Sequence, residues 1–399
     1  DPYDTSALAL APCSGTGPWG EALRRLAAEE RCAFLDLTTP WAEYVRSSGL
    51  HPHRFYRDRV HANEYGEQIL GRILVAFFTP EDSAIWPRLD WFQDLKLGFM
   101  LHWGPYSQWG CIESWPLVPA DPWARPADLP AWAERGGDIE RFSRDYRALP
   151  TTFHPARFDP DRWVEAARAA GMRYVVFTTK HHDGFCMFDT RTTTNRITAP
   201  HVPFHTNARS NIAFEVFRAF REHGFGIGAY FSKPDWSHPG YWDLTRPVTN
   251  RNPNYDTLAE PERWAQFVNF THAQIEELMT RYGTVDILWL DGGQVRPPRQ
   301  DIRMDELVAM ARRHQPELIV VDRTVGGRHE QYHTPEQHIP NGPLPYVWET
   351  CLTIGKSWSF KPNDRYKSVR ELVHTLVDIV AKGGNLLLNV GPQPDGELP

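Results

Sequence analysis

Asp291 stands at a position where a carboxylate could take part in catalysis. It follows a nearly continuous apolar stretch, residues 285–290, and is followed directly by Gly292 and Gly293. Such a stretch predicts a strand buried on both faces, and the glycines allow the chain to turn sharply after it. Barrel enzymes built from parallel strands carry their catalytic groups at this end of a strand. An acid here can also simply cap the following turn, so the other strands have to decide between the two interpretations.

Polar side chains follow five other predicted strands in the same way. The strand ends are His102-Trp103, Lys180-His181-His182-Asp183, Ser232-Lys233-Pro234-Asp235, Asp322-Arg323 and Trp348-Glu349. A single histidine at a strand end is more often structural, but the repeated pattern indicates that these groups share one face of the fold. The sequence has no H-E-x-x-H motif, and adjacent residues such as His181 and His182 rarely bind one ion without further ligands. We therefore expect no metal and no cofactor.

The remaining strand-end chemistry consists of carboxylates, imidazoles, a guanidinium and tryptophan. Glycoside hydrolysis needs two carboxylates across the scissile bond and hydrogen-bonding groups for the ring hydroxyls. The 16 tryptophans fit such a reaction, because sugar rings stack on flat apolar faces, although large hydrophobic cores also use tryptophan. The set of residues therefore favours a glycosidase.

Strands and helices alternate in the part of the sequence that must position these residues. We expect strands at residues 97–102, 174–178, 226–231, 285–291, 318–321, 346–348 and 386–390, and helices at 161–170, 212–222, 262–279, 304–313 and 369–380. This α/β alternation predicts parallel strands with crossover helices, and seven strands fit a (β/α)8-like (TIM-type) barrel with one missed or degenerate strand. An open doubly wound sheet is the alternative, but residues 97–390 contain no glycine-rich phosphate loop.

Residues 1–80 follow a separate pattern. Strands are expected at 7–12 and 32–37, and helices at 19–30 and 65–78. Asp58 and His61 resemble the last motif of the lipase and esterase family with the Ser-Gly-Asn-His signature, in which the Asp orients a His that activates a serine. No Gly-Asp-Ser motif that would supply the serine is present. We interpret residues 1–80 as a partial α/β fragment of this kind with a vestigial esterase pair, residues 81–95 as a linker and residues 96–399 as the barrel.

The composition narrows the range of partners. The 399 residues carry a formal net charge of -7, which argues against nucleic acids and anionic membranes as main partners. No apolar run approaches the ~18 residues that a membrane span requires. The five cysteines include no C-x-x-C pair, so neither a disulfide framework nor a zinc site is suggested.

Several motifs together resemble glycoside hydrolase family 29, the retaining α-L-fucosidases. Between residues 97 and 392 they read LGFMLHWGPYSQWG, ESW, KHHDGFCMFDT, AYFS, WLDGG, VDRT, TPEQ, WETC and GGNLLLNVGP. The resemblance implies that Asp291 is the nucleophile, forming a fucosyl-enzyme ester that water hydrolyses with retention. It implies that Glu336 is the acid/base. Glu349 is the alternative, which could instead hold a sugar hydroxyl or Arg323.

The resemblance also implies sugar-binding positions, namely His102, Glu113, Trp115, His181, His182, Tyr230, Trp289 and Arg323. Imidazoles and a carboxylate would bind the ring hydroxyls, while Trp and Tyr would line the C5 methyl group of fucose. The expected substrate is a fucosylated oligosaccharide or glycoconjugate, and the QWG and KHHDGF strings suggest α1,3 or α1,4 linkages. The segments 207–211 and 357–360 depart from the family pattern without removing a catalytic group.

Two other functions stay open at this point. One is an esterase activity of a longer bifunctional parent chain, and the other is a fucose-binding protein without turnover. A retaining enzyme requires its two carboxyl groups to lie ~5–5.5 Å apart, which would separate it from a binding protein. Secretion or a periplasmic location is expected, because fucosidases of this kind often meet their glycans outside the cytoplasm.

Overall fold

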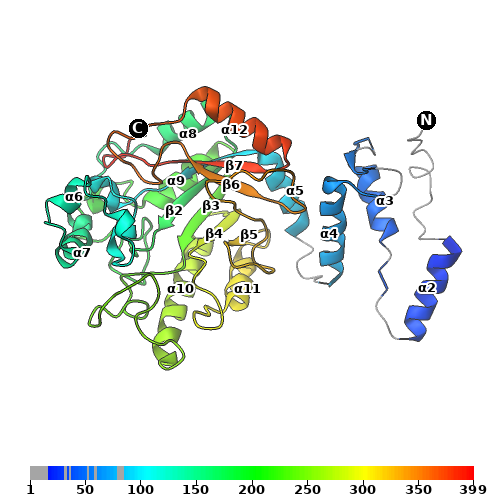
Figure 1. The fold of residues 1–399 in the computed structure, drawn as a ribbon, viewed down its shortest axis with the longest axis horizontal. Coiled ribbons are helices and arrows are strands. Elements are labelled where there is room, and N and C mark those ends of the chain that lie inside the picture. The colour runs from blue at the N-terminus through cyan, green and yellow to red at the C-terminus, as the bar shows by residue number, and fades with distance from the viewer. Residues whose placement is uncertain (1–16, 31–33, 36, 52–53, 58–60, 79–84) are drawn as a thin grey trace. The chain divides into compact units, whose positions relative to one another are not determined.

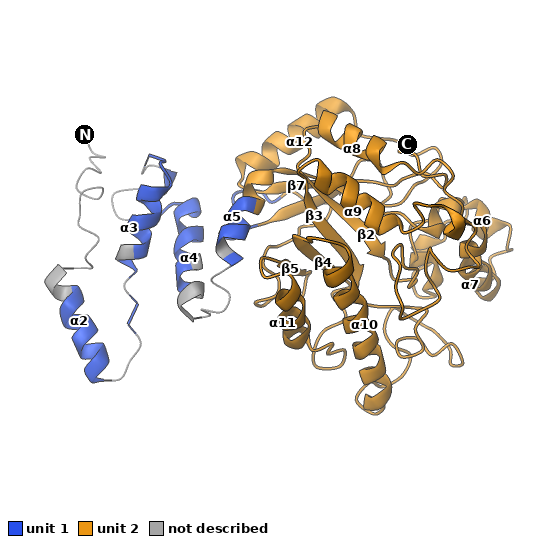
Figure 2. Ribbon diagram, turned by 180° about the vertical axis from the view of Figure 1, so that it is seen from behind, with its two compact units in different colours: residues 1–91, 340–347 blue, residues 92–339, 348–399 orange. Residues whose placement is uncertain are grey.

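The computed structural model describes residues 17–30, 34–35, 37–51, 54–57, 61–78 and 85–399. The chain forms two compact units, residues 1–91 with 340–347 and residues 92–339 with 348–399 (Figure 2). The helices among the described residues of 1–95 are α2 (Gly17–Glu29), α3 (Thr38–Ser47), α4 (Glu64–Phe78) and α5 (Trp86–Leu95). The predicted site residues of the barrel all belong to the second unit.

The second unit is built around seven parallel strands. They are β1 (Leu97–Leu101), β2 (Tyr174–Lys180), β3 (Gly226–Ser232), β4 (Ile287–Asp291), β5 (Ile319–Asp322), β6 (Glu349–Thr353) and β7 (Asn385–Val390). Their hydrogen-bonded order is β5-β4-β3-β2-β1-β7-β6, so β1 lies beside β7 and the edges are β5 and β6. The curled parallel sheet confirms the predicted (β/α)8-like fold.

Helices cover the outside of this sheet (Figure 1). They are α8 (Pro160–Ala169), α9 (Ile212–Glu222), α10 (Pro261–Arg281), α11 (Met304–His314) and α12 (Val369–Ala381). The bounds agree with the predicted helices to within two residues, because each helix has a clear apolar face. In α9, for example, Ile212, Val216 and Phe220 are fully buried at helical spacing.

The sixth strand differs from the prediction. The sequence places it at residues 346–348, whereas β6 begins at Glu349. A carboxylate at the start of a fully buried strand contradicts the usual apolar pattern, and Glu349 is 0% exposed. Its three hydrogen-bond donors, described below, explain why the strand tolerates it.

Residues 329–337 connect the two edge strands. Asp322 N in β5 donates to the His329 carbonyl at 2.8 Å, and a parallel bridge pairs Glu336 with Cys351 in β6. This irregular segment therefore stands where an eighth strand would close the barrel. It also anchors Glu336 by backbone hydrogen bonds rather than leaving it on a free loop.

Aromatic side chains close the amino-terminal end of the barrel. Phe92 stacks on Tyr332, with ring centroids 4.2 Å apart, and meets Tyr174 edge-on at 5.6 Å. Gly98 makes room for this layer, since a Cβ atom there would lie 2.2 Å from the Tyr174 ring. The Tyr174 hydroxyl donates to Glu349 at 2.6 Å, so the aromatic layer supports the buried carboxylate.

The described residues of the first unit are mainly helical. Trp41, Phe55 and Ile69 form its hydrophobic core. Helices α2 and α4 confirm those predicted at 19–30 and 65–78.

The structure differs from two expectations for this part of the chain. The strand expected at 32–37 is not found in its described residues 34, 35 and 37, and residues 86–95 of the expected linker form helix α5. The sequence does not predict a helix there because Pro80 and Pro87 indicate a connector, but Pro87 occupies the first turn, where proline is tolerated. The strand expected at 7–12 lies outside the described residues.

None of the described helices is both long and apolar enough to cross a lipid bilayer.

Candidate active site

A cavity of about 700 Å³ opens at the carboxyl ends of the strands. It is lined by every site residue predicted for the barrel except Glu349. The residues that the sequence pattern did not identify are Met100, Ile112, Trp123, Arg251, Asn252, Gly292, Gly293, Gln294, Arg296, Thr324 and Trp358. A cavity at this end of the strands with several convergent ionisable groups is a candidate active site.

Asp291 is held at both carboxylate oxygens. The Tyr230 hydroxyl donates to Oδ2 at 2.7 Å, and Arg323 Nη1 donates to Oδ1 at 3.0 Å. Burial alone would raise the pKa of Asp291, but the positive charge of Arg323, together with His182 and the hydrogen bonds, holds that pKa well below its usual range. Asp291 is therefore an ionised, oriented carboxylate on the cavity wall, as a nucleophile needs to be.

Arg323 joins Asp291 to Glu336. Its Nη2 donates to Glu336 Oε2, its Nε donates to Thr334 Oγ1 at 3.1 Å, and its guanidinium lies over the Trp289 ring at 4.8 Å. With all three nitrogens bound, the guanidinium fixes the relative position of the two carboxylates. The Glu336 side chain is 44% exposed against 18% for Asp291, so Glu336 is the one open to the cavity mouth.

Glu349 lies outside the cavity lining. It is fully buried and accepts hydrogen bonds from Tyr174 Oη at 2.6 Å, Trp289 Nε1 at 3.1 Å and Tyr332 Oη at 3.4 Å. Burial raises the pKa of Glu349 to about 7 against the opposing effect of these bonds. This alternative acid/base thus lies against the indole nitrogen of Trp289 and does not line the cavity.

His102 is locked in one tautomer. Its Nδ1 lies 2.7 Å from Asn389 Oδ1, and the amide orientation follows from Asn389 Nδ2, which donates to the Trp358 carbonyl at 2.6 Å. Nδ1 therefore carries the proton and Nε2 is an acceptor. Burial lowers the pKa of His102 to about 4, although the Asn389 bond opposes it, so the imidazole is neutral at neutral pH.

His182 is likewise oriented by a hydrogen bond at Nδ1. Its Nδ1 donates to Ser232 Oγ, whose own proton goes to the Pro234 carbonyl at 2.8 Å. Nε2 is again an acceptor, 3.9 Å from Asp291 Oδ2. Burial lowers the pKa of His182 to about 4, against the charge of Asp291. Neutral imidazoles with free acceptor nitrogens suit sugar hydroxyls.

Glu113 reaches the cavity through an unusual backbone conformation. Its φ is 38°, in the left-handed region that costs a non-glycine residue on the order of 1–3 kcal/mol. The side chain is 1% exposed and accepts from Ser359 N at 2.6 Å. Burial raises the pKa of Glu113 to about 8, with the charges of Glu336 and Asp291 acting in the same direction. A protonated carboxyl can donate a hydrogen bond to a ligand.

Other strand-end residues pair with each other and do not line the cavity. Lys180 Nζ lies 3.2 Å from Asp235, and Lys233 forms an ion pair with Asp322, all four side chains being buried. These pairs tie the ends of β2, β3 and β5 together. Their role is therefore to hold the cavity wall, which the sequence pattern alone does not distinguish from lining the cavity.

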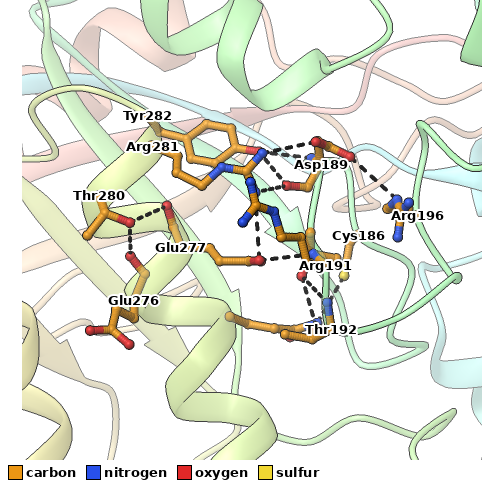
Figure 3. Close-up of polar contacts among 12 residues, drawn as sticks. Cys186, Asp189, Arg191, Thr192, Arg196, Glu276, Glu277, Thr280, Arg281 and Tyr282 are labelled. Atoms are coloured by element: carbon orange, nitrogen blue, oxygen red, sulfur yellow. Dashed lines mark hydrogen bonds and ion pairs between the residues drawn. The ribbon is translucent and has the colours of Figure 1, made fainter.

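The loop after β2, which carries His181 and His182, is fastened to α10 (Figure 3). Arg281 Nη2 donates to Asp189 Oδ2 at 3.0 Å and Arg281 Nη1 donates to the Asp189 carbonyl at 2.9 Å. Glu277 accepts from Arg191 N at 2.9 Å. This network fixes the far end of the loop and so limits the freedom of the two histidines.

His181, His182 and Asp291 also form a group whose potential metal-ligating atoms lie within 4.8 Å of one another. However, His181 Nδ1 already contacts Ser114 Oγ at 2.6 Å, and Asp291 is neutralised by Arg323. A divalent cation would compete with that guanidinium, so the donor set fits a hydroxylated ligand better than a metal.

Sequence reasoning missed the residues that orient the imidazoles. Ser114 and Ser232 lie inside the strings ESW and AYFS, and Asn389 lies inside GGNLLLNVGP, so the motifs contained them without indicating a role. Trp358 lies in a segment that departs from the family pattern, yet its ring centroid is 5.2 Å from that of His102.

Comparison with known proteins identifies the family of the barrel. The family model described as alpha-L-fucosidase matches residues 79–399. The chain belongs to the alpha-L-fucosidase family. The family match covers the whole barrel and confirms the predicted family and its class, a glycoside hydrolase, while residues 1–78 lie outside it.

Members of the alpha-L-fucosidase family with solved structures share the fold. Alpha-L-fucosidase isoenzyme 1 from Paenibacillus thiaminolyticus is 32% identical, with a TM-score of 0.65 over 79% of this chain and 72% of that chain. Alpha-L-fucosidase AlfC from Lactobacillus casei, solved with its alpha-L-fucose product, is 28% identical, with a TM-score of 0.61 over 78% of this chain and 93% of that one. These likenesses support the barrel assignment independently of the motifs.

Curated relatives are more distant. Tissue alpha-L-fucosidase from Rattus norvegicus is 27% identical over 80% of this chain, and plasma alpha-L-fucosidase from Homo sapiens is 27% identical over 78%. The chain spans 67% and 66% of the lengths of these two proteins, and 64% of a relative from Caenorhabditis elegans.

Proposed function

We propose that this chain is an exo-acting retaining α-L-fucosidase that removes terminal α-L-fucosyl groups from glycans. The observation that carries the proposal is the bridge that Arg323 makes between Asp291 and Glu336 on the cavity wall. Two carboxylates fixed relative to each other, one buried and one near the mouth, are what a double displacement requires. The family match supports the same reaction.

In the first step Asp291 attacks the anomeric carbon, and the bond to the leaving oxygen breaks. Tyr230 and Arg323 each hold one oxygen of Asp291 and so keep the attacking carboxylate oriented, which lowers the entropy lost in reaching the transition state. Glu336 gives its proton to the leaving oxygen. In the second step Glu336 takes a proton from water, which attacks the fucosyl ester and restores Asp291.

This role requires Glu336 to exchange one partner for another. Glu336 accepts a hydrogen bond from Arg323, whereas the first step needs it to donate a proton to the leaving oxygen. The exposed side chain of Glu336 can turn toward a leaving oxygen while its backbone stays paired with Cys351. Of the two carboxylates, Arg323 would then bind only Asp291.

The other cavity residues would recognise the sugar. His102 and His182 offer acceptor nitrogens to hydroxyl groups, and protonated Glu113 offers a donor. Tyr230 and Trp289 stack with ring centroids 5.3 Å apart and supply an apolar surface for the C5 methyl group. A hydroxymethyl group at that place would be left with an unpaired polar atom, at a cost of ~1–3 kcal/mol.

The test uses an aryl α-L-fucoside and two variants. Asp291→Gly should lower kcat/KM by on the order of 10⁴-fold or more, because no other carboxylate can form the ester. Glu336→Ala should slow substrates with poor leaving groups far more than activated ones. Azide should restore its turnover and give the α-fucosyl azide, the anomer expected when Asp291 still forms the ester. Wild-type activity in Asp291→Gly would overturn the proposal.

We further propose that the enzyme prefers α1,3- or α1,4-linked fucose. This proposed preference rests on the motif strings alone. A variant of AlfC, another member of the family, was solved with Fuca(1,6)GlcNAc, so the linkage preference has to be measured for each member. Hydrolysis rates on a panel of fucosyl disaccharides differing only in linkage would decide it.

The esterase resemblance of residues 1–80, and with it the boundaries proposed for that fragment and linker, also rests on sequence pattern. Asp58 lies outside the described residues, and His61 is exposed. If the fragment has esterase activity within a longer parent chain, that chain should hydrolyse a short acyl ester and lose this activity in His61→Ala. The proposed secreted or periplasmic location can be tested by cell fractionation.

A further inference from the structure

The mouth of the cavity differs in chemistry from its floor. The floor is formed by buried imidazoles and aromatic rings, whereas the mouth carries the exposed side chains of Trp123, Asn252, Arg296 and Thr324 and the half-exposed Arg251. A volume of about 700 Å³ is within the ~300–1,000 Å³ that is usual for ligand sites, and one deoxyhexose fills only part of it. The mouth residues, called the rim below, would therefore face whatever is linked to the fucose.

Apart from Glu336, which Arg323 binds, the ionisable residues at the mouth are two arginines. Arg296 is exposed and forms no ion pair with a described residue. Arg251 lies over the Trp115 ring at 4.6 Å and is fixed by Asp121, which accepts from Nε at 3.1 Å and from Nη2 at 2.9 Å. Its remaining nitrogen, Nη1, donates to no described residue.

The carboxylates that line the cavity already have binding partners or are buried. Asp291 and Glu336 both bind Arg323, and Glu113 is buried with its pKa raised to about 8 by burial. Arg323 neutralises only one of these two carboxylates, and Asp121 pairs with Arg251, so the rim guanidinium that has no ion-pair partner among the described residues is that of Arg296. Also on the rim, Trp123 is 53% exposed, which is unusual for so large an apolar side chain and provides a surface on which a sugar ring can stack.

We propose that the rim is a binding site for an anionic leaving-group sugar, one that carries a sulfate ester or a carboxylate, with Trp123 against its ring and Arg251 and Arg296 at its charge. Guanidinium groups bind planar or tetrahedral oxyanions through charge-assisted hydrogen bonds. The inference rests on the proposed fucosidase activity and adds the chemical class of the acceptor.

The test compares one aryl α-L-fucoside with three fucosyl disaccharides whose leaving sugar is neutral, sulfated or carboxylated and otherwise identical. At low ionic strength kcat/KM should be about tenfold or more higher for an anionic acceptor than for the neutral one. The preference should shrink as salt is added, because exposed charges are screened. The two anionic disaccharides separate a sulfate site from a carboxylate site.

Variants of the rim locate the effect. Arg296→Gln should reduce the anionic-to-neutral ratio of kcat/KM several-fold, and Arg296→Lys should keep part of it. Arg299→Gln is the matched control, because Arg299 is an exposed arginine of the same loop that does not line the cavity. Equal kcat/KM for neutral and anionic disaccharides in the wild type, or an unchanged ratio in Arg296→Gln, would overturn the inference.

A failure of the proposed fucosidase activity can be distinguished from a failure of the rim inference. If the aryl fucoside is not hydrolysed, the fucosidase proposal is wrong. Calorimetric affinities for the intact neutral and anionic disaccharides then decide the rim inference on the same protein. Tighter binding of the anionic disaccharides would support it, and equal affinity would exclude it.

Discussion

Glu349 accepts a hydrogen bond from the indole nitrogen of Trp289 at 3.1 Å, behind the wall that carries Asp291. Both groups that hold Asp291 pack on that indole. Tyr230 stacks on Trp289 with ring centroids 5.3 Å apart, and the Arg323 guanidinium lies over it at 4.8 Å. We therefore expect Glu349 to act on the proposed nucleophile through Trp289, as a positioning residue.

Substitution of Glu349 should separate positioning from acid/base catalysis. Glu349→Gln keeps an acceptor oxygen for Trp289, so kcat should fall by about tenfold or less, whereas Glu349→Ala leaves three donors unpaired and should destabilise the fold by ~2–5 kcal/mol. Azide should restore neither variant, in contrast to Glu336→Ala. Leaving-group dependence, azide rescue and thermal unfolding are the measurements. Rescue of Glu349→Ala by azide would restore Glu349 as the acid/base.

Tyr230→Phe should weaken the hold on Asp291 without removing an apolar surface. The lost bond goes to a charged group, worth ~1.5–3 kcal/mol, so kcat for an aryl fucoside should fall about tenfold to a hundredfold. Tyr106→Phe is a matched control, because the Tyr106 hydroxyl is buried without a hydrogen-bond partner among the described residues. That variant should keep near wild-type activity, and an equal loss in both would show that the effect is not specific to Asp291.

Much of the barrel follows from its sequence because buried parallel strands are continuous apolar runs. Asp291, His102 and Arg323 could be predicted as site residues since each stands at or next to the end of such a run. Glu349 could not be placed, because its burial depends on donors from distant strands. The rim residues could not be predicted either. Trp123, Arg251 and Arg296 lie far apart in the sequence without a shared motif and line one cavity only in the folded chain.

Asn389→Asp tests the tautomer of His102. A carboxylate beside Nδ1 should raise the pKa of His102 from about 4, so the imidazole becomes a cation at low pH and Nε2 turns from acceptor to donor. KM for the aryl fucoside should rise at acidic pH and approach the wild-type value as pH increases through the new pKa. A KM increase that does not vary with pH would instead indicate a packing defect.

Glu113 should set an alkaline limit on activity. Burial raises its pKa to about 8, so Glu113 is neutral below that pH and ionised above it. Ionisation places a third negative charge near Asp291 and Glu336 and removes a donor for the substrate. The kcat/KM of the wild type should therefore fall above about pH 8. Glu113→Gln should lose this limb, whereas Glu134→Gln, on an exposed side chain, should keep it.

The raised pKa of Glu113 also predicts how the stability of the protein depends on pH. An unfolded Glu titrates at ~4.3, whereas folded Glu113 holds its proton up to about pH 8. Between these values the folded state binds more protons than the unfolded state, so its free energy of unfolding falls as pH rises, by at most ~1.4 kcal/mol per pH unit. Denaturant unfolding of wild type and Glu113→Gln across pH 4–9 should show a smaller decline in the variant. Parallel curves would mean that Glu113 is ionised in the folded protein at neutral pH.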